Sequence, residues 1–487
     1  MDKTQKSSLF KVISASSMGT LIEWYDFYIF GSLAIVISTK FFPSDNPTAA
    51  FLSTLATFAA GFVVRPFGAL FFGRLGDLIG RKYTFMATLL LMGGATFLIG
   101  CVPSFETIGY AAPILVLILR LLQGLALGGE YGGAATYVAE HAPKGQRGYF
   151  TSWIQTTATV GLFISLMVIL ITKNVLSDSQ FDAWGWRVPF WVSIVMVFVS
   201  YMIRKKMHES PEFAKAKAEG NISKNPLKDS FGNKYNLKFV LLALFGATMG
   251  QGVIWYTGQF YAMSFMKTVL AIDSSQVDTL LGIALLFGTP FFVVFGWLSD
   301  KIGRKSIMMF GMLLAILLYR PIYKTMYETV NVAHKELVSK KLITEGNNVI
   351  TYKVYADKTE VKEVQNQTDL TIKTQMTISN SDRWMLVFLV FIQVIFVTMV
   401  YGPIAAFLVE MFPTKIRYTS MSLPYHVGNG IFGGLLPAIS TYFVTNAKTN
   451  GNPEYYLEGL WYPIIIASVC FVIGMIYLSW KNETTND

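Results

Sequence analysis

The strongest constraint on the fold of this chain is a charged ten-residue stretch that occurs twice, each time between long apolar runs. The first copy, at 73–82, reads GRLGDLIGRK, and the second, at 296–305, reads GWLSDKIGRK. Asp, Gly, Arg and Lys occupy matching positions in the two copies. Because a stretch that recurs in register marks a repeated structural unit, the sequence predicts a protein built from two equivalent halves.

The apolar runs around these stretches are long enough to cross a lipid bilayer. The chain of 487 residues is 53% hydrophobic and only 14% charged, whereas a soluble domain usually carries about 25% charged residues. An α-helix needs about 20 apolar residues to span the hydrocarbon core. Twelve segments meet this requirement: 13–39, 48–73, 83–102, 111–139, 148–172, 187–206, 238–266, 276–299, 305–324, 384–411, 418–445 and 459–480. The predicted fold is an all-α membrane protein with 12 transmembrane helices in two pseudo-symmetric six-helix bundles.

A polar, basic stretch at the midpoint of the chain separates the two predicted bundles. It covers 207–237 and is punctuated by Pro and Gly, so we expect an N-terminal bundle at 1–206, a cytoplasmic linker, and a C-terminal bundle at 238–487. A basic cluster at the start of the linker either recognises anionic lipid headgroups or only fixes the orientation of the sixth helix; its members are Arg204, Lys205 and Lys206.

The distribution of basic residues predicts the orientation of the chain. With the N-terminus inside, the cytoplasmic loops and tails carry 23 Lys and Arg and the short outer loops carry five, in agreement with the positive-inside rule. Both termini are therefore expected in the cytoplasm. The formal net charge of +10 is explained by this partition and does not favour nucleic-acid binding. No phosphate loop, metal-ligand cluster or nucleophile elbow occurs in the sequence, so we expect neither an enzyme nor a metal site.

A second repeated signature locates an insertion in the C-terminal half. The pattern E-x-x-P-x-x-x-R occurs at 140–147 and at 410–417, and these copies are 270 residues apart, whereas the first pair is 223 residues apart. The extra 47 residues must lie between the two signatures of the second half. Only 325–382 is polar enough to hold them, so we expect an extracytoplasmic insertion there, between the ninth and tenth helices.

The insertion carries two kinds of pattern. The piece at 323–342 resembles a helix, whereas 349–355 and 370–378 alternate between apolar and polar residues, as strands do. We expect a small β-hairpin or mini-sheet on the outer face. A disordered loop is the alternative, because two or three strands alone are marginally stable in water.

Two bundles of six helices related by a parallel repeat resemble the major facilitator superfamily, and the stretches at 73–82 and 296–305 are similar to its signature loops. Further motifs resemble the metabolite:proton symporter family of that superfamily, which includes proline/betaine, α-ketoglutarate, citrate and shikimate carriers. These motifs are GTLIEWYDF at 19–27, FVVRPFG at 62–68, RLLQGLALGGEYG at 120–132, WGWRVPF at 184–190, HESPEF at 208–213 and EMFPTKIRY at 410–418. The resemblance covers nearly the whole chain apart from the insertion.

The resemblance implies a carrier for a small-molecule substrate and protons. It would be driven by the proton gradient without a bound cofactor, and it would act as a monomer in the lipid bilayer of the bacterial cytoplasmic (inner) membrane.

Charged residues inside the predicted helices are candidates for chemistry, because each costs about 2.5–3.5 kcal/mol to insert. Glu23 and Asp26 lie three residues apart on one face of the first helix. Two carboxylates this close repel each other in a low dielectric, so either is a candidate to exchange a proton; a static ion pair with a buried arginine is the alternative. Arg65 and Arg120 are the expected counter-charges, and either could bind an anionic substrate. The resemblance favours Arg120 in proton coupling, Arg65 could instead be structural, and Glu130 is interpreted as a hydrogen-bonding group at a helix-packing site or as a further coupling group.

The candidate substrate-binding residues lie on two other predicted helices. The seventh helix carries three on one face and one beside them: Gln251, Trp255, Gln259 and Tyr256. The eleventh adds a second polar patch: Tyr425, His426 and Asn429. These groups suit hydrogen bonding to a small polar solute, and the indole could contact a cationic one. Interfacial aromatics with interhelical hydrogen bonds are the alternative, and a lone histidine is expected to be structural.

The repeated loops are expected to form a gate. A carboxylate at a helix end can accept hydrogen bonds from the N-terminus of another helix and pair with an arginine of the opposite half. Such contacts would close the cytoplasmic side in the outward-open state. The candidate gating residues are Gly73, Asp77, Arg81, Glu140, Arg147, Asp300, Arg304, Glu410 and Arg417. A purely topological role for the basic residues would leave the repeated Asp and Gly unexplained.

The leading hypothesis for function is a proton symporter that imports a small organic acid or zwitterion by alternating access. The alternatives are a facilitator or proton antiporter on the same fold, and a membrane sensor that uses the external insertion.

Overall fold

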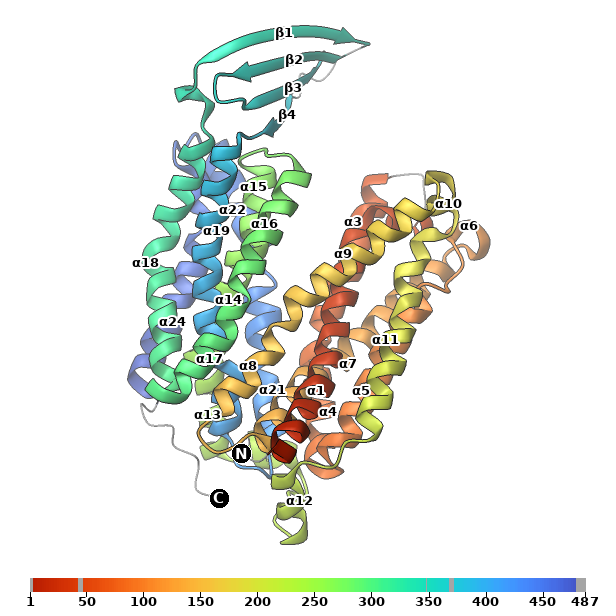
Figure 1. Cartoon of the computed structure of the whole chain (residues 1–487), viewed down its shortest axis with the longest axis vertical. Coiled ribbons are helices and arrows are strands. Elements are labelled where there is room, and N and C mark those ends of the chain that lie inside the picture. The colour runs from red at the N-terminus through yellow and green to blue at the C-terminus, as the bar shows by residue number, and fades with distance from the viewer. Residues whose placement is uncertain (1–2, 43–46, 347, 368–371, 479–487) are drawn as a thin grey trace.

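The computed structural model describes residues 3–42, 47–346, 348–367 and 372–478. Figure 1 shows two helical bundles side by side, with a small β-sheet standing on the second one. Within the described residues, ten helices are long and apolar enough to cross a membrane, or up to eleven if one bent pair counts as a single span. The predicted all-α membrane fold with a small β insertion is confirmed.

The N-terminal bundle contains the first six expected spans, some of them divided into two helices. Its helices are α1 (Lys3–Ser32), α2 (Ala34–Phe41), α3 (Pro47–Val63), α4 (Arg65–Leu78), α5 (Arg81–Ile99), α6 (Phe105–Ile108), α7 (Ala111–His141), α8 (Arg147–Gln155), α9 (Thr157–Val175), α10 (Asp178–Ala183) and α11 (Val188–Lys205). The chain bends by 67° between α1 and α2. The break between α3 and α4 precedes Pro66, whose ring fixes the backbone and removes a hydrogen-bond donor.

The C-terminal bundle follows the linker, which contains α12 (Pro211–Ala218). Its helices are α13 (Lys234–Ala243), α14 (Met249–Tyr256), α15 (Ala262–Thr268), α16 (Ser274–Gly288), α17 (Pro290–Ile302), α18 (Arg304–Val330), α19 (Asn380–Tyr401), α20 (Ile404–Met411), α21 (Arg417–Val427), α22 (Leu436–Thr449), α23 (Tyr455–Glu458) and α24 (Trp461–Tyr477). Wider π-helical turns interrupt the seventh and eleventh spans at Leu244–Thr248, Thr257–Tyr261 and Gly428–Gly433. Such turns are rare and often mark functional sites.

The outward surfaces of both bundles are apolar. Phe198 in α11 is 64% exposed and Leu317 in α18 is 60% exposed. In a soluble protein such side chains would mostly be buried, and a contiguous apolar surface of this kind suits contact with lipid. The chain is a multi-pass membrane protein.

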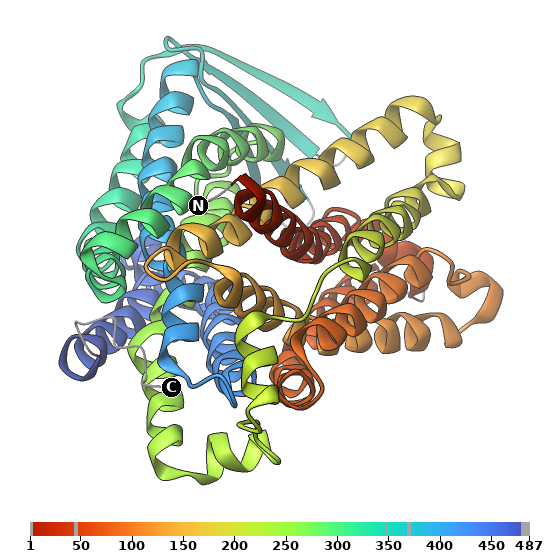
Figure 2. The ribbon, with the colours of Figure 1, turned by 60° about the horizontal axis from the view of Figure 1, so that its bottom comes forward.

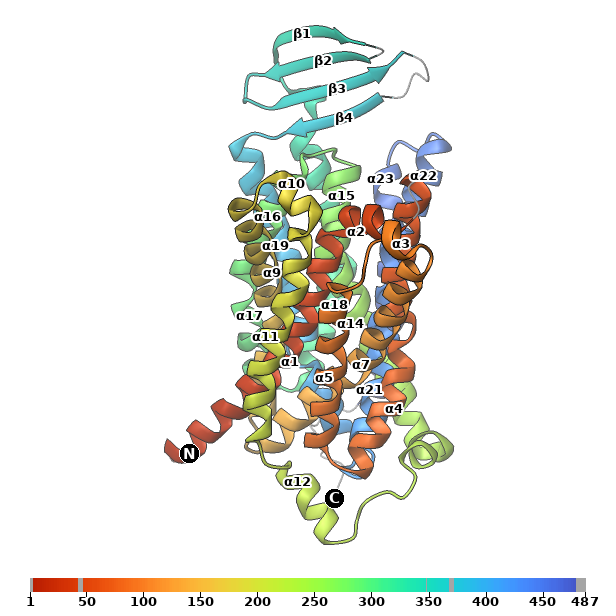
Figure 3. The same cartoon turned by 90° about the vertical axis from the view of Figure 1, so that its right-hand side faces the viewer.

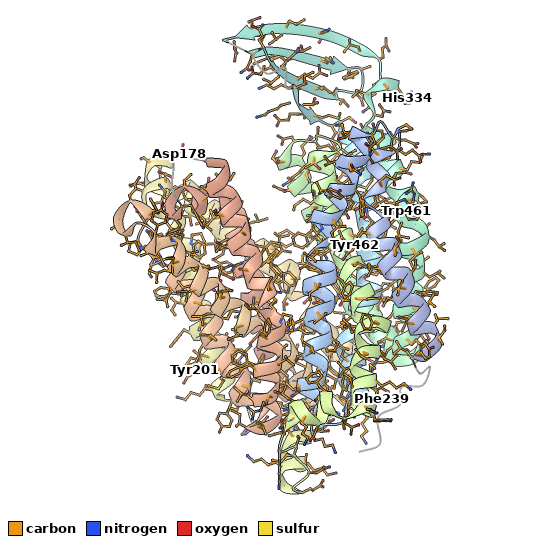
Figure 4. The ribbon with its side chains drawn as sticks, turned by 180° about the vertical axis from the view of Figure 1, so that it is seen from behind. Asp178, Tyr201, Phe239, His334, Trp461 and Tyr462 are labelled. Atoms are coloured by element: carbon orange, nitrogen blue, oxygen red, sulfur yellow. The ribbon has the colours of Figure 1, made fainter. Side chains whose placement is uncertain are left out.

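The two bundles meet mainly at one end of the molecule. We call it the linker end, because α12 lies there, and we call the opposite end the sheet end (Figures 1 and 3). At the linker end α4 packs against α21, α8 against α17, and α20 against both α7 and α8. Figure 2 shows the linker crossing this end on its way from α11 to α13. Toward the sheet end the bundles diverge, and Figure 4 places Asp178 and His334 on the two sides of that divergence.

The insertion folds into a four-stranded antiparallel sheet, with strand order β1-β2-β3-β4. The strands are β1 (Leu337–Glu345), β2 (Asn348–Tyr355), β3 (Glu360–Asn366) and β4 (Ile372–Thr377). The expected mini-sheet is present with more strands than predicted, and the expected strand at 370–378 lies partly outside the described residues. The helix expected at 323–342 was wrong beyond Val330, because 337–345 pairs with β2 along its length.

The sheet is fastened to the C-terminal bundle by backbone and side-chain contacts. Ile272 forms a parallel bridge with Met376, and the Met376 N–H donates to the Ala271 carbonyl at 2.7 Å. Lys335 donates to Asp357 at 2.6 Å and to Asp382, at the start of α19, at 2.5 Å. These bonds hold the sheet in one position above α15, α16 and α19.

Candidate functional site

The first helix carries its two carboxylates into the interior of the N-terminal bundle, where both are buried. Asp26 accepts one hydrogen bond from Arg120 and one from Gln123, both at 2.8 Å. Gln123 in turn accepts from Arg120 at 2.7 Å and donates to Thr96 at 2.7 Å. The Asp26 carboxylate is therefore held in a closed hydrogen-bond network supplied by α5 and α7.

Glu23 is held much more loosely. Its Oε1 lies 3.6 Å from Arg65 Nη1, which is an ion-pair distance beyond normal hydrogen bonding. Among the residues that the structure describes, the Glu23 carboxylate accepts no hydrogen bond. The Arg65 guanidinium also lies over the Phe62 ring at 4.3 Å, and its buried Nε has no hydrogen-bond partner there. The sequence does not distinguish the two carboxylates, but their surroundings differ: Asp26 accepts two hydrogen bonds, whereas Glu23 has a single long ion pair.

The polar stripe of the seventh span is brought against the eleventh. Gln251 donates to the Asn429 side chain at 3.1 Å, and Asn429 donates back at 2.9 Å. Gln259 is also buried, inside the π-helical turn that follows α14. His426 is buried on α21, and it neighbours Tyr425 in an edge-on ring contact with centroids 5.1 Å apart.

Aromatic rings join the first helix to the seventh. Trp24, next to Glu23 in the chain, lies with its ring centroid 4.9 Å from that of Trp255. Tyr256 packs edge-on against Trp255 at the same distance, and Phe260 lies 5.3 Å from it. The candidate substrate residues of the C-terminal bundle therefore lie beside the helix that carries the two carboxylates.

Stacked tyrosines close the space between the bundles toward the linker end. The Tyr131 ring, on α7, stacks on the Tyr425 ring, on α21, with centroids 3.7 Å apart. The Tyr425 hydroxyl lies 2.6 Å from the Tyr401 hydroxyl. Tyr131 also accepts from Gln155 at 2.7 Å. These contacts fix one ring from each bundle against the other.

Both repeated aspartates contact the N-terminus of a helix in the opposite bundle. Asp77 accepts from the backbone N–H of Tyr418 at 3.3 Å, and from the N–H and hydroxyl of Thr419 at 2.8 and 2.7 Å. Asp300 accepts from the N–H groups of Gly148 and Tyr149 at 2.9 and 2.8 Å. Those groups begin α21 and α8, where the unpaired N–H groups and the helix dipole favour a negative charge. The two contacts are related by the internal repeat.

The repeated aspartates were expected to pair with an arginine of the opposite half, and this expectation is wrong. Among the described residues, neither aspartate pairs with an arginine of the opposite bundle, because Arg81 and Arg304 lie one helical turn after them and reach back at 2.7 and 2.5 Å. Two arginines cross between the bundles: Arg417 donates to Glu140 at 2.9 Å and to Glu212 of the linker at 2.5 Å, and Arg81 donates to the Thr414 carbonyl at 2.7 Å.

The remaining gating candidates lie beside these contacts. We call the whole set of candidate gating residues the linker-end cluster. Arg304 donates to both oxygens of Glu410, at 3.1 and 3.0 Å. Arg147 donates to Glu212 and to the Ala139 carbonyl. Gly73 is a close-approach position, because a Cβ there would lie 2.9 Å from the Thr419 Cα.

Sequence reasoning missed the carboxylates of the linker. Glu212 bridges Arg147 of one bundle and Arg417 of the other. Glu209 accepts from the backbone N–H groups of Arg81 and Lys82, at 3.1 and 3.3 Å, where α5 begins. The signal was present in HESPEF at 208–213, because two carboxylates lie beside Ser210, which caps α12.

Arg204 was also misinterpreted. It is fully buried, donates to Glu130 at 2.5 Å and to the Phe85 carbonyl at 2.5 Å, and its guanidinium lies over the Phe85 ring. It therefore does not face lipid headgroups. Glu130 also accepts from Thr88 at 2.6 Å, so the expected packing-site hydrogen bonds include a buried ion pair.

Two helical bundles that carry the same loop signature, meet through reciprocal helix-terminus contacts and enclose buried charges define a transporter of the major facilitator type. A family model described as sugar (and other) transporter matches residues 11–238. The inner membrane metabolite transport protein YhjE of Escherichia coli is 33% identical over 446 residues, which cover 90% of this chain and 88% of that protein. The chain belongs to the sugar (and other) transporter family within the major facilitator superfamily, is related to its metabolite:proton symporters, and is not an enzyme.

Two other similar proteins match a larger share of this chain. The proline/betaine transporter of Escherichia coli is 29% identical, and the match covers 98% of this chain and 84% of that protein. The solved structure of the proton:xylose symporter XylE bound to 6-bromo-6-deoxy-D-glucose superposes with a TM-score of 0.72 at 16% identity, and it covers 99% of this chain and 98% of that one. At that identity the structural likeness concerns the fold alone.

Proposed function

We propose that this chain is a secondary active transporter that imports a small polar metabolite, an organic acid or a zwitterionic osmolyte, together with protons across the bacterial inner membrane. The observation that carries the proposal is the loose pair between the buried Glu23 and the half-buried Arg65, on the helix whose Trp24 contacts Trp255 of the seventh span. The relation to the proline/betaine transporter supports a small polar solute.

Glu23 is proposed as the proton carrier and Arg65 as the anchor for the substrate. Asp26 would have to give up its hydrogen bonds from Arg120 and Gln123 before it could take a proton, and breaking such a buried network is costly. Glu23 has only a 3.6 Å ion pair to exchange. Protonation of Glu23 would release Arg65 to hold a carboxylate, because a guanidinium binds carboxylates through paired N–H groups.

The remaining candidates would orient the solute. The amide pair Gln251–Asn429 can exchange its mutual hydrogen bonds for bonds to a polar solute. Trp255 presents a ring that can cover an apolar or quaternary ammonium part. Tyr256 and Gln259 lie on the same span and would complete the site.

The linker-end cluster is proposed as the cytoplasmic gate. Excess Lys and Arg at this end support a cytoplasmic location under the positive-inside rule, so the divergence at the sheet end would face outward. In the inward-open state α21 and α8 would have to leave Asp77 and Asp300. Alternating access would then be a rocking of one bundle against the other.

The test is uptake into proteoliposomes with an imposed pH gradient, using labelled succinate, α-ketoglutarate, citrate, shikimate, proline and betaine. We expect one class of solute to accumulate when protons are directed inward, and E23Q to abolish accumulation while still permitting exchange. Equilibration without accumulation would instead identify a facilitator, and accumulation under an outward gradient an antiporter. Transport that is normal while a response is lost on deletion of 337–377 would favour a sensor.

A further inference from the structure

A pocket of about 380 Å³ lies between strands β3 and β4 and the segment that joins α15 to α16. Pockets that bind small molecules usually have volumes of about 300–1,000 Å³. The pocket is separate from the buried carboxylates, and it is formed by the insertion that interrupts the internal repeat. The transport mechanism described above makes no use of it.

Three lysines line the pocket. Lys267 is paired with Asp278 at 2.6 Å. Lys362 and Lys373 project from one face of the sheet, since Lys362 lies opposite Gln375 and Lys373 lies two residues before it. In the described part of the chain neither of these two lysines is paired with a carboxylate, and Lys362 instead lies 5.6 Å from the centre of the Tyr352 ring.

The one acidic residue among the described lining residues is Asp273, and its oxygens are already engaged. One oxygen caps α16 by accepting from the N–H of Ser275 at 2.9 Å, and the other accepts from Gln375 at 2.5 Å. The negative charge of Asp273 is therefore partly neutralised by the N-terminus of α16. Among the described residues, neither sheet lysine is paired with this carboxylate.

The pocket lies close to the outer end of the proposed substrate path. Lys267 follows Gln259 by eight residues in the same helical span, which corresponds to about 12 Å at the rise of an α-helix. Figure 1 shows the strands extending from the C-terminal bundle toward the divergence between the bundles. A solute held beneath β3 and β4 would therefore be at the entrance to the central site.

We propose that this pocket is an outer binding site for a small organic anion, which Lys362 and Lys373 hold by its carboxylate before it moves to the central site. Val364 and Ile272, which also line the pocket, would cover an apolar part of the molecule. The proposal rests on the proposed transport function for its role in uptake, but binding of the anion can be measured without transport.

The binding test is protection of lysines from an amine-reactive reagent, read for each lysine by mass spectrometry of the purified full chain. Succinate should lower the reactivity of Lys362 and Lys373 at least threefold, and the uncharged analogue succinamide should not. Lys340, exposed on the other face of the sheet, is the control. High salt should weaken the protection, because exposed charges are screened. Equal reactivity with and without succinate would overturn the proposal.

A lipid phosphate shares the chemistry of a carboxylate, so the labelling is repeated in vesicles of phosphatidylcholine with and without phosphatidylglycerol. Protection by phosphatidylglycerol in the absence of succinate would assign the pocket to a lipid headgroup and refute a solute site. Protection by succinate in pure phosphatidylcholine would support it.

The role in uptake is tested with K362Q/K373Q, using whichever carboxylate of the panel accumulates. The KM should rise about three- to tenfold, since exposed charge pairs contribute modestly, while kcat and the response to the pH gradient stay unchanged. K340Q/K358Q removes the same charge elsewhere on the sheet and should leave the KM alone. An unchanged KM in K362Q/K373Q would refute the recruiting role. If no solute accumulates at all, the proposed function fails, and the labelling result still decides whether this site exists.

Discussion

Replacing Asp77 by Asn should shift the protein away from the conformation that is closed at the linker end. The ion pair with Arg81 lies within one bundle, so it can be made in either conformation and does not enter the size of the shift. The three hydrogen bonds to Tyr418 and Thr419 cross between bundles and exist only while the linker end is closed. These are the bonds that Asp77→Asn weakens.

The size of the shift follows from those three bonds. Hydrogen bonds to a charged group contribute about 1.5–3 kcal/mol each, but an Asn oxygen can still accept one or two weaker ones. A net loss of about 2–3 kcal/mol changes the conformational equilibrium about 30- to 150-fold. A population of 99:1 in favour of the closed linker end would then approach about 1:1.

The assay is the distance between nitroxide labels at the sheet end, measured by pulsed electron spin resonance. Labels at Asp178→Cys and Thr279→Cys, in a background lacking Cys101 and Cys470, report the separation of the two bundles; both label positions are exposed. We expect D77N to add a population with a shorter distance. E219Q, which removes an exposed charge at the linker end, should not. A folded D77N protein with the wild-type distance distribution would refute the gating argument.

Three further predictions concern other parts of the molecule. E23Q should make uptake independent of the pH gradient, as measured by accumulation in proteoliposomes. R204Q should lower thermal stability markedly, because leaving Glu130 unpaired in a buried site costs about 3–5 kcal/mol; E130Q/R204Q should lose less. Burial raises the pKa of the Asp357 carboxyl, but the hydrogen bonds from Lys335 and Thr359 and the Lys335 charge together outweigh burial, so the pKa lies below its ordinary value. Asp357 therefore stabilises the sheet above its unfolded pKa of about 3.9, and this contribution is lost as the pH falls through the lower folded value, so hydrogen-exchange protection of the sheet should drop below about pH 4.

Each of these predictions has its own contradicting result. E23Q uptake that still responds to the gradient would assign the proton elsewhere. R204Q and E130Q/R204Q of equal stability would mean that the unpaired Glu130 carboxylate carries no penalty. Equal hydrogen-exchange protection of the sheet in wild type and K335M at every pH would show that Lys335 does not anchor the sheet.

Hydropathy alone located most of the spans, because a bilayer demands long apolar helices wherever the chain crosses it; of the twelve expected, ten or eleven are long and apolar enough within the described residues. The repeated stretches also revealed the two halves and placed Asp77 and Asp300 at equivalent positions. The partners of those aspartates could be anticipated in kind, since a helix N-terminus attracts a carboxylate whatever the surrounding fold. Such a local rule can be applied without knowing the tertiary structure.

Other features depend on contacts between distant segments, which one sequence does not specify. Arg204 was assigned to a basic loop cluster because its neighbours are lysines, whereas its guanidinium turns inward to Glu130. Glu212 acquires its role only when two arginines, 65 residues before it and 205 after it, meet at the same place. The difference between Glu23 and Asp26 likewise comes from donors on other helices.

The attachments of the external sheet described above, through Ile272, Lys335 and Met376, are all to the C-terminal bundle. A sheet fixed in this way would follow any rotation of that bundle as a lever arm. Its outermost strand β1, farthest from the pivot at the linker end (Figure 1), would then move through the largest displacement. A fluorophore on Glu345 would convert the transport cycle into an optical signal without touching the membrane-embedded helices.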